Sequence, residues 1–127
     1  MREWQMEARR SAAGESHAWF VARVEGADVG TIQGRRRRPH TLLVFSMWVD
    51  PGQRGSGVGR RLVETIESWG LGWGATNTLL WVYENNVEAV RFYERLGFGV
   101  ERTGGDAEAG ASFAALAMRR KISVSAT

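Results

Sequence analysis

The chain has 127 residues, of which 43% are hydrophobic and 24% charged. This length and composition are typical of one globular domain, here residues 1–127, and exclude both a disordered chain and two ordinary domains. The absence of Cys excludes disulfides, thiolate metal sites and a cysteine nucleophile, and two His residues argue against a zinc site, so no metal is expected. Without a signal-peptide pattern or an apolar run of about 20 residues, we expect a cytoplasmic protein that does not enter membranes.

The charge balance is mildly basic. The 17 Lys and Arg residues exceed the 14 Asp and Glu residues, which gives a formal net charge of +3. Four of the arginines form one run, Arg35–Arg38, and the rest of the chain is close to neutral. An arginine run can bind nucleic acid, but no aromatic-rich nucleic-acid motif accompanies this one. A solvated turn is therefore favoured, and nucleic acid is not an expected partner.

Hydrophobic periodicity divides the chain into helices and strands. The first segment carries Trp4, Ala8 and Ala12 at helical spacing. The predicted elements, in chain order, are a helix over residues 3–13, a hairpin of strands 17–24 and 29–33, a polar connection over 34–40 that holds the arginine run, a buried strand over 41–49, a helix that begins at residue 58 and ends in the glycines at 70–74, a strand over 79–83, a helix after residue 86 that stops at residue 97, a strand over 98–103, a loop over 104–110 and a last strand over 111–119.

The central strand, loop, helix and strand form a crossover, which makes its two strands parallel. The hairpins on either side are antiparallel. The sequence therefore predicts an α/β fold with a mixed, mostly antiparallel sheet, in which helices flank one central parallel pair.

A glycine-rich segment joins the strand over 41–49 to the helix that begins at Val58. It reads Asp50-Pro51-Gly52-Gln53-Arg54-Gly55-Ser56-Gly57. Glycines let a backbone turn tightly and expose its N–H groups, which form an anion site together with the positive end of the helix dipole. Arg54 and Arg60 add charges suited to phosphate.

Two common phosphate-binding motifs do not fit this segment. Gly52 and Gly57 have the spacing of a nucleoside-triphosphate loop, but Val58 follows where the loop requires Lys and then Ser or Thr. Gly55 and Gly57 begin a dinucleotide fingerprint, but Arg60 replaces its third glycine and no acidic residue ends the next strand. A nucleoside triphosphatase and a dinucleotide-binding protein are therefore disfavoured.

Two motifs together resemble the GNAT superfamily of N-acetyltransferases. The first is Arg-x-x-Gly-x-Gly, present as Arg54-Gly55-Ser56-Gly57-Val58-Gly59. The second is Asn-x-x-Ala-x-x-Phe-Tyr-x-x-x-Gly-Phe, present from Asn86 to Phe98. Both lie in the family's order on predicted elements of the right type, and the resemblance runs from about residue 19 to about residue 119.

The resemblance implies that the glycine loop holds the pyrophosphate of acetyl-CoA, the co-substrate of this family. It also implies that backbone groups of the preceding strand hold the pantetheine arm, and that an N–H group of Met47 or Val49 polarises the thioester carbonyl. Asn86 either hydrogen-bonds the pantetheine arm or only caps its helix. The expected cofactor-binding residues are Met47, Trp48, Val49, Arg54, Gly55, Ser56, Gly57, Val58, Gly59, Arg60, Asn86 and Tyr93.

The family's tyrosine corresponds to Tyr93, which the resemblance implies is the general acid at the sulfur; the alternative is an aromatic packed on the inner helix face. For the general base we rank Glu84 first, with Asp50 and His40 after it. Glu84 could equally be a solvated charge, and a water relay or a neutral acceptor would need no base residue.

The acceptor side is less well defined by the sequence. Trp48, Trp81 and Trp19 either line the acceptor site or belong to the core. The acceptor itself, a small-molecule or peptide amine, is not specified.

The N-terminus departs from the family, which usually opens with a strand and a helix before the segment that begins this chain. An N-terminally shortened fold would leave the strand over 17–24 as a sheet edge. A minimal member, a partner subunit such as a second copy in a homodimer, and a true start upstream all stay open as explanations.

The resemblance therefore predicts an acetyl-CoA-dependent N-acetyltransferase, a cytoplasmic enzyme that acts on an amine by direct transfer. The alternative is a non-catalytic acyl-CoA-binding or regulatory module. The unassigned base and the shortened N-terminus favour that alternative.

Overall fold

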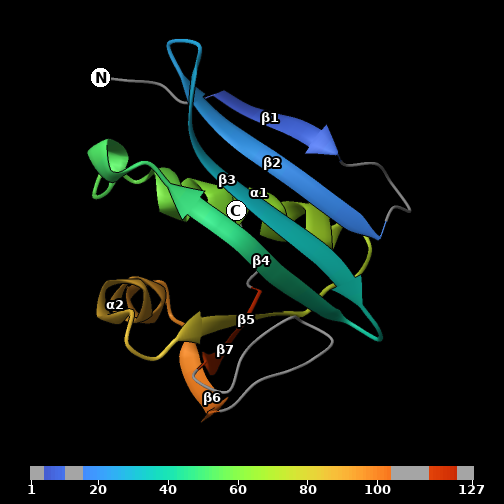
Figure 1. Ribbon diagram of the computed structural model, residues 1–127. Helices are drawn as coiled ribbons and strands as arrows, with labels where there is room; N and C mark the ends of the chain where they lie inside the picture. The colour runs from blue at the N-terminus through green and yellow to red at the C-terminus, as the bar shows by residue number, and fades with distance from the viewer. Residues whose placement is uncertain (1–4, 11–15, 104–114, 123–127) are drawn as a thin grey trace.

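The computed structural model describes residues 5–10, 16–103 and 115–122. They form a seven-stranded sheet in the order β1-β2-β3-β4-β5-β7-β6, in which only β4 and β5 are parallel (Figure 1). The predicted mixed sheet with one central parallel pair is confirmed. The strands are β1 (Gln5–Arg10), β2 (His17–Val24), β3 (Ala27–Arg37), β4 (Thr41–Val49), β5 (Asn77–Tyr83), β6 (Gly99–Thr103) and β7 (Ala115–Lys121). The helices are a single 3₁₀ turn η1 (Pro51–Gln53), α1 (Val58–Leu71) and α2 (Val87–Arg95).

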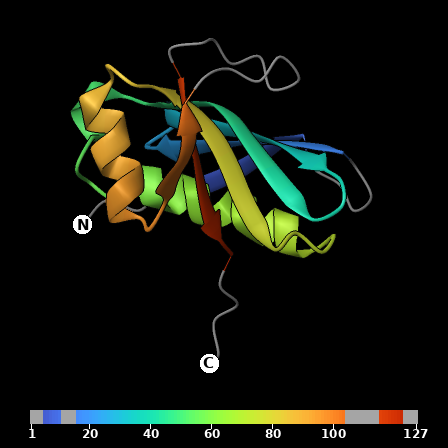
Figure 2. The ribbon, with the colours of Figure 1, turned by 90° about the horizontal axis from the view of Figure 1, so that it is seen from below.

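Helix α1 lies along one face of the sheet, as Figure 2 shows. Its predicted apolar stripe is confirmed, because Val58, Leu62 and Ile66 are fully buried. They pack in the main core against β2, β3 and β4. This burial fixes α1, and therefore the loop that precedes it, against the middle of the sheet.

The two parallel strands, β4 and β5, separate toward their carboxyl ends. Strands β4 and β5 pair only from Thr41–Asn77 to Val44–Leu80. Beyond this point β4 carries a bulge, since two of its residues, Ser46 and Met47, lie where β3 has one. Ser46 has a left-handed φ of 52°, and such a bulge bends a strand. The last five residues of β4 therefore run without pairing to β5, and the burial predicted on both faces holds only for the first half of the strand.

The predicted helix over residues 3–13 is wrong where the structure describes it. Residues 5–10 form β1, which pairs antiparallel with β2. A helix this short is marginal on its own, whereas a strand here satisfies the backbone groups that β2 would otherwise leave unpaired. The strand over 17–24 is therefore not a sheet edge.

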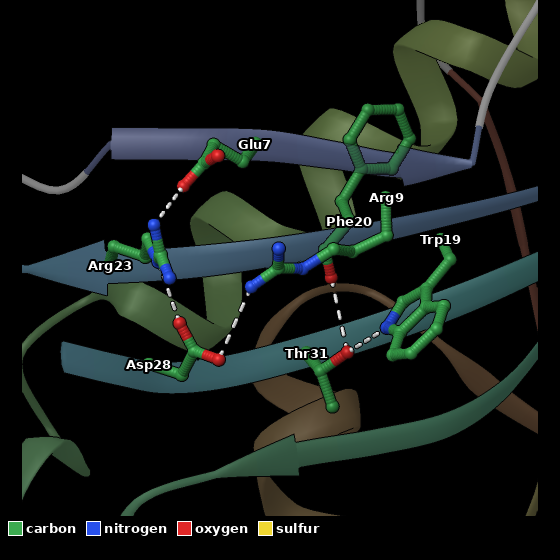
Figure 3. A network of polar contacts seen from close by, with 7 residues as sticks. All are labelled: Glu7, Arg9, Trp19, Phe20, Arg23, Asp28 and Thr31. Atoms are coloured by element: carbon green, nitrogen blue, oxygen red, sulfur yellow. Dashed lines mark hydrogen bonds and ion pairs between the residues drawn. The ribbon is translucent and has the colours of Figure 1, made fainter. Parts of the chain in front are cut away.

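Side chains also tie β1 to its neighbours (Figure 3). Arg23 of β2 contacts Glu7 of β1 at 2.8 Å and Asp28 of β3 at 2.7 Å, and Arg9 of β1 lies 3.4 Å from Asp28. The hydrogen bond from Arg23 is the main cause that lowers the pKa of Asp28. The network crosses three strands and holds the N-terminal strand in register.

The arginine run does not lie in a polar connection as predicted. Strand β3 continues to Arg37, which pairs with Thr41 of β4, so only Arg38 of the run falls in the turn. Cross-strand pairing with β4 extends the strand through residues that are polar by composition. The guanidinium of Arg36 also lies 5.1 Å from the ring centre of Trp73, so the run is only partly solvated.

The remaining predicted elements agree with the structure within a few residues. The β2–β3 turn has positive φ at both Glu25 and Gly26, which suits a tight hairpin. The predicted loop over 104–110, and the start of the last predicted strand, lie outside the described residues. No helix in the part of the chain that the structure describes is long and apolar enough to cross a membrane.

Candidate active site

The glycine loop leaves backbone donors free at the start of α1. Gly55 and Gly57 have φ of 82° and 95°, a conformation that favours glycine. Gly57 is the N-cap of α1 and supplies no capping side chain. The backbone N–H of Arg61 donates to the Gly57 carbonyl at 3.1 Å, which is the first hydrogen bond of the helix. The N–H groups of the first turn therefore have no acceptor within the helix. No acidic residue occupies this turn, so the N-terminus is suited to an anionic ligand.

Two arginines flank these donors. Arg60 and Arg54 are exposed, and the Arg54 guanidinium lies 3.9 Å from the carboxylate of Glu88. That side-chain pair is 57% and 89% exposed, and pairs so open to water contribute little stability. Both arginines can therefore turn toward a phosphate at low cost.

The second half of β4, residues 45–49, borders the opening where β4 and β5 no longer pair. Because its last five residues do not pair with β5, its backbone groups on that side have no partner strand. Met47 and Val49 are half-buried and pack against the core, and Trp48 is 46% exposed. This stretch can bind an extended ligand through its main chain, in the way that a new strand joins a sheet edge.

Tyr93 of α2 lies against this stretch of β4. Its hydroxyl donates to the sulfur of Met47 at 3.1 Å, and the phenol is only 8% exposed. Phe92, the residue before it, packs beside Gly59 at the start of α1, so closely that a Cβ at Gly59 would lie 2.9 Å from its ring, and Met47 reaches the same point. The buried phenol, the free edge of β4 and the first turn of α1 therefore meet in one place.

Burial raises the pKa of Tyr93 to about 12. The phenol is consequently protonated throughout the neutral range and can donate a hydrogen bond but not accept a proton there. The Tyr93 ring packs edge-to-face against the rings of Phe92 and Phe98, with ring centroids 5.1 Å and 5.5 Å apart. Tyr93 is thus both a packed aromatic and an aimed donor.

The other predicted residues are divided between the two ends of the sheet. Asn86 caps α2, because its side chain accepts from the N–H of Ala89 at 3.3 Å. Glu84 lies exposed in the turn that follows β5, and Asp50 is half-buried directly after β4. His40 precedes Thr41 and so lies at the opposite end of β4 from the glycine loop.

The tryptophans differ in exposure. Trp48 and Trp19 are 46% and 39% exposed, while Trp81 is half-buried. Trp19 donates from its indole to the hydroxyl of Thr31 at 2.6 Å (Figure 3). Thr31 of β3 also pairs with Trp48 of β4, so Trp19 and Trp48 flank the same threonine.

Sequence reasoning missed a polar cluster between α1, β5 and β7. Glu67 of α1 is 6% exposed and accepts from Thr78 of β5 at 2.6 Å and from Arg120 of β7 at 3.0 Å. A signal for it was present, since Glu67 follows Val63 by four residues and so shares a buried face of α1 with it. A surface groove of about 560 Å³ lies beside this cluster, and Glu67, Leu96 and Arg120 are among the residues that line it.

The fold and the site together define a class of domain: a mixed sheet in which a helix N-terminus with free backbone donors lies beside an opened pair of parallel strands. Comparison with known proteins agrees. The acetyltransferase (GNAT) family model matches residues 1–98. The chain therefore belongs to the GNAT family of acetyltransferases.

Individual relatives are similar over part of their length. An uncharacterised N-acetyltransferase of Methanocaldococcus jannaschii is 29% identical over 90 residues, which are 66% of this chain and 40% of the relative. A mycothiol acetyltransferase of Streptosporangium roseum is 40% identical over 55 residues, 43% of this chain and 16% of the relative. The chain thus spans less than half the length of these two curated relatives.

Solved structures share the fold. A nourseothricin acetyltransferase is 27% identical with a TM-score of 0.74, over 84% of this chain and 65% of the other. Ard1 of Thermoplasma volcanium is 26% identical with a TM-score of 0.72, over 84% and 71%. A putative streptothricin acetyltransferase of Bacillus anthracis, solved with acetyl coenzyme A, has a TM-score of 0.76 at 20% identity, over 88% and 66%.

Proposed function

We propose that this chain transfers an acetyl group from acetyl-CoA directly to an amine of a small molecule or peptide. The observation that carries the proposal is the meeting of the Tyr93 hydroxyl, the unpaired half of β4 and the first turn of α1. Membership of the GNAT family and the acetyl-CoA bound to one structural neighbour support the choice of co-substrate.

The residues present fit such a co-substrate. The free N–H groups after Gly57, with Arg54 and Arg60, would hold its phosphates. Backbone groups of residues 47–49 would hold the pantetheine arm, and an N–H group of Met47 or Val49 would polarise the carbonyl. The co-substrate supplies an acetyl group already activated as a thioester, so the protein has only to position, polarise and move protons.

We assign to the Tyr93 hydroxyl the role of hydrogen-bond donor to the departing sulfur. The hydroxyl already donates to a sulfur, that of Met47, which shows that an O–H···S contact fits at this place. With a phenol pKa of about 12 against about 8.5 for a thiol, complete proton transfer from Tyr93 is uphill by about 5 kcal/mol. Tyr93 therefore acts as a hydrogen-bond donor while charge develops on the sulfur, and full protonation follows through solvent.

The acceptor side is proposed from position alone. Glu84 lies at the carboxyl end of β5 and is our candidate for the base that accepts the amine proton. The exposed indoles of Trp19 and Trp48 form a flat, apolar wall suited to a planar or apolar amine.

Binding of the co-substrate is tested by calorimetry with acetyl-CoA. Gly57→Glu places a carboxylate at the anion site and is expected to abolish binding. Gly74→Glu is the matched control, because Gly74 has nearly the same φ, 94°, but lies beyond the other end of α1. No binding by the unmodified chain, or equal loss in both variants, would refute the anion site.

Turnover is tested by coenzyme A release across a panel of amines. Tyr93→Phe is expected to slow release by about 10²-fold while acetyl-CoA affinity stays within about twofold, since one hydrogen-bond donor aimed at developing charge contributes a factor of this order. Tyr83→Phe, which changes the chain's other tyrosine, is the control. Equal turnover in Tyr93→Phe would remove Tyr93 from the mechanism. Tight binding without release for any amine would favour the non-catalytic acyl-CoA-binding module.

A further inference from the structure

A buried ion pair and its hydrogen bonds connect α1, β5 and β7. The guanidinium of Arg120 on β7 contacts both carboxylate oxygens of Glu67 on α1, one of them at 3.0 Å. The same carboxylate accepts from the fully buried Thr78 of β5 at 2.6 Å. The side chains of Glu67 and Arg120 are 7% and 20% exposed, so water screens this pair weakly.

Arg120 reaches the end of α2 as well. Its remaining terminal nitrogen donates to the carbonyl of Leu96, the C-cap of α2. A positive charge at this position also favours the negative end of the helix dipole. One planar guanidinium thus joins α1 to the end of the helix that carries Tyr93, a geometry that lysine cannot reproduce.

The guanidinium also holds the ring that packs on Tyr93. It lies 5.0 Å from the centroid of Phe98, whose ring is edge-to-face with Tyr93 at 5.5 Å. The backbone closes the same link, because the N–H of Phe98 donates to the carbonyl of Tyr93 at 3.0 Å. The path from Glu67 to the Tyr93 ring therefore consists of four residues in direct contact.

We propose that Glu67 and Arg120 are positioning residues, which hold the Tyr93 hydroxyl against β4 by fixing Phe98 and the end of α2. The inference rests on the proposed function for its catalytic consequence, but not for its structural one. Neither residue lies at the glycine loop, so the pair acts on the placement of Tyr93 and not on the binding of phosphates. Because burial raises the pKa of Tyr93, a change in the placement of its ring should also change that pKa.

The test uses a Tyr83→Phe background, in which Tyr93 is the only tyrosine. Ring-labelled tyrosine then gives one carbon NMR signal that reports the placement and ionisation of this phenol. Arg120→Lys keeps the charge opposite Glu67 but loses the fork that reaches Leu96 and the planar stack on Phe98. Arg23→Lys is the matched control, because Arg23 also contacts two side chains, Glu7 and Asp28, but on the first strands of the sheet.

We expect Arg120→Lys to shift or split the Tyr93 signal and to let the phenol ionise closer to the ordinary value of about 10. In the same variant kcat for coenzyme A release should fall at least about tenfold, with the KM for acetyl-CoA within about twofold, because small misplacements of a reacting group cost this much. Arg23→Lys should change neither reading. An unchanged signal in folded Arg120→Lys, or an equal kcat loss in Arg23→Lys, overturns the proposal.

A second variant guards against loss of folding. Glu67→Gln with Arg120→Met removes both charges, so that neither is left buried without its partner. The Tyr93 signal should move in this variant too, and an unmoved signal contradicts positioning. Failure of the proposed function is separable: if Tyr93→Phe turns over normally, the catalytic role of Tyr93 falls, while the NMR signal still decides whether the pair places the ring.

Discussion

Gly59 lies where α1, α2 and β4 come closest, and its replacement by alanine tests whether this contact shapes the site. A Cβ there would lie 2.9 Å from Cζ of Phe92, 3.2 Å from Cε1 of the same ring and 3.4 Å from Cε of Met47. Carbon atoms in contact settle at about 3.5 Å or more, so the Phe92 ring must retreat by at least about 0.6 Å. Met47 stays at an ordinary contact distance, but Tyr93 follows Phe92 in α2, so a backbone shift that relieves the clash also moves the Tyr93 hydroxyl from its place against Met47.

Two opposing effects set the size of the stability change. Overpacking of this kind costs about 1–3 kcal/mol, while alanine in place of glycine within a helix gains about 1 kcal/mol. We expect a net loss of about 1 kcal/mol, which lowers Tm by about 4 °C in a domain of this size. The effect on function should be larger than this, because the displaced side chains face the opening.

The assay combines thermal unfolding, calorimetry with acetyl-CoA and coenzyme A release. Gly59→Ala should unfold slightly earlier, bind acetyl-CoA several-fold more weakly and release coenzyme A at least about tenfold more slowly. Gly55→Ala is an informative companion, because a Cβ at Gly55 meets nothing within 4 Å and only its φ of 82° opposes the change. A Gly59→Ala variant that is more stable than the parent and turns over normally would refute the packing argument.

Three further predictions concern stability. Asn86→Ala should cost about 1 kcal/mol in urea unfolding by removing the cap of α2, with acetyl-CoA affinity unchanged if capping is its only role. Gly34→Ala should cost about 2 kcal/mol in the same assay, because a Cβ would lie 2.7 Å from Ile66 in the core. Asp28→Asn should reduce stability above pH 4 and match the parent in more acidic buffer: Arg23 lowers the folded-state pKa of Asp28, so its contribution is present above the unfolded pKa of about 3.9 and is lost as pH falls through the folded pKa. A difference between these two chains that persisted at pH 2 would contradict that linkage.

The centre of the fold was predictable because the period of hydrophobic residues changes there. A continuous apolar run ends at Val49, and from Val58 the apolar residues follow a helical stripe, so strand, loop and helix are all marked locally. The same applies to α2, whose start is marked by Asn86 and whose end is marked by Gly97 with a φ of 98°. Local sequence was enough wherever one element buries its own apolar face.

The first strand and the end of β3 were not predictable in this way. Residues 5–9 alternate between polar and apolar, but this short run competes with the helical spacing of Trp4, Ala8 and Ala12, and Arg35–Arg37 are uniformly polar. Both segments are extended because a neighbouring strand pairs with them, which is a property of the partner and not of the segment. The bulge at Ser46, which opens β4, likewise has no marker in an apolar strand.

The two halves of the candidate site are held by different forces, and this explains why the sequence indicated the geometry of the glycine loop but only the identity of Tyr93 and not its placement. The anion loop depends on glycine conformations written within eight residues of sequence, whereas the place of Tyr93 depends on Arg120 and Glu67, which lie on other elements. Variants in the loop should therefore act on co-substrate affinity, and variants in the buried pair should act on turnover. A separation of this kind between KM and kcat is the result that two independent supports predict, and a single cooperative support would change both constants together.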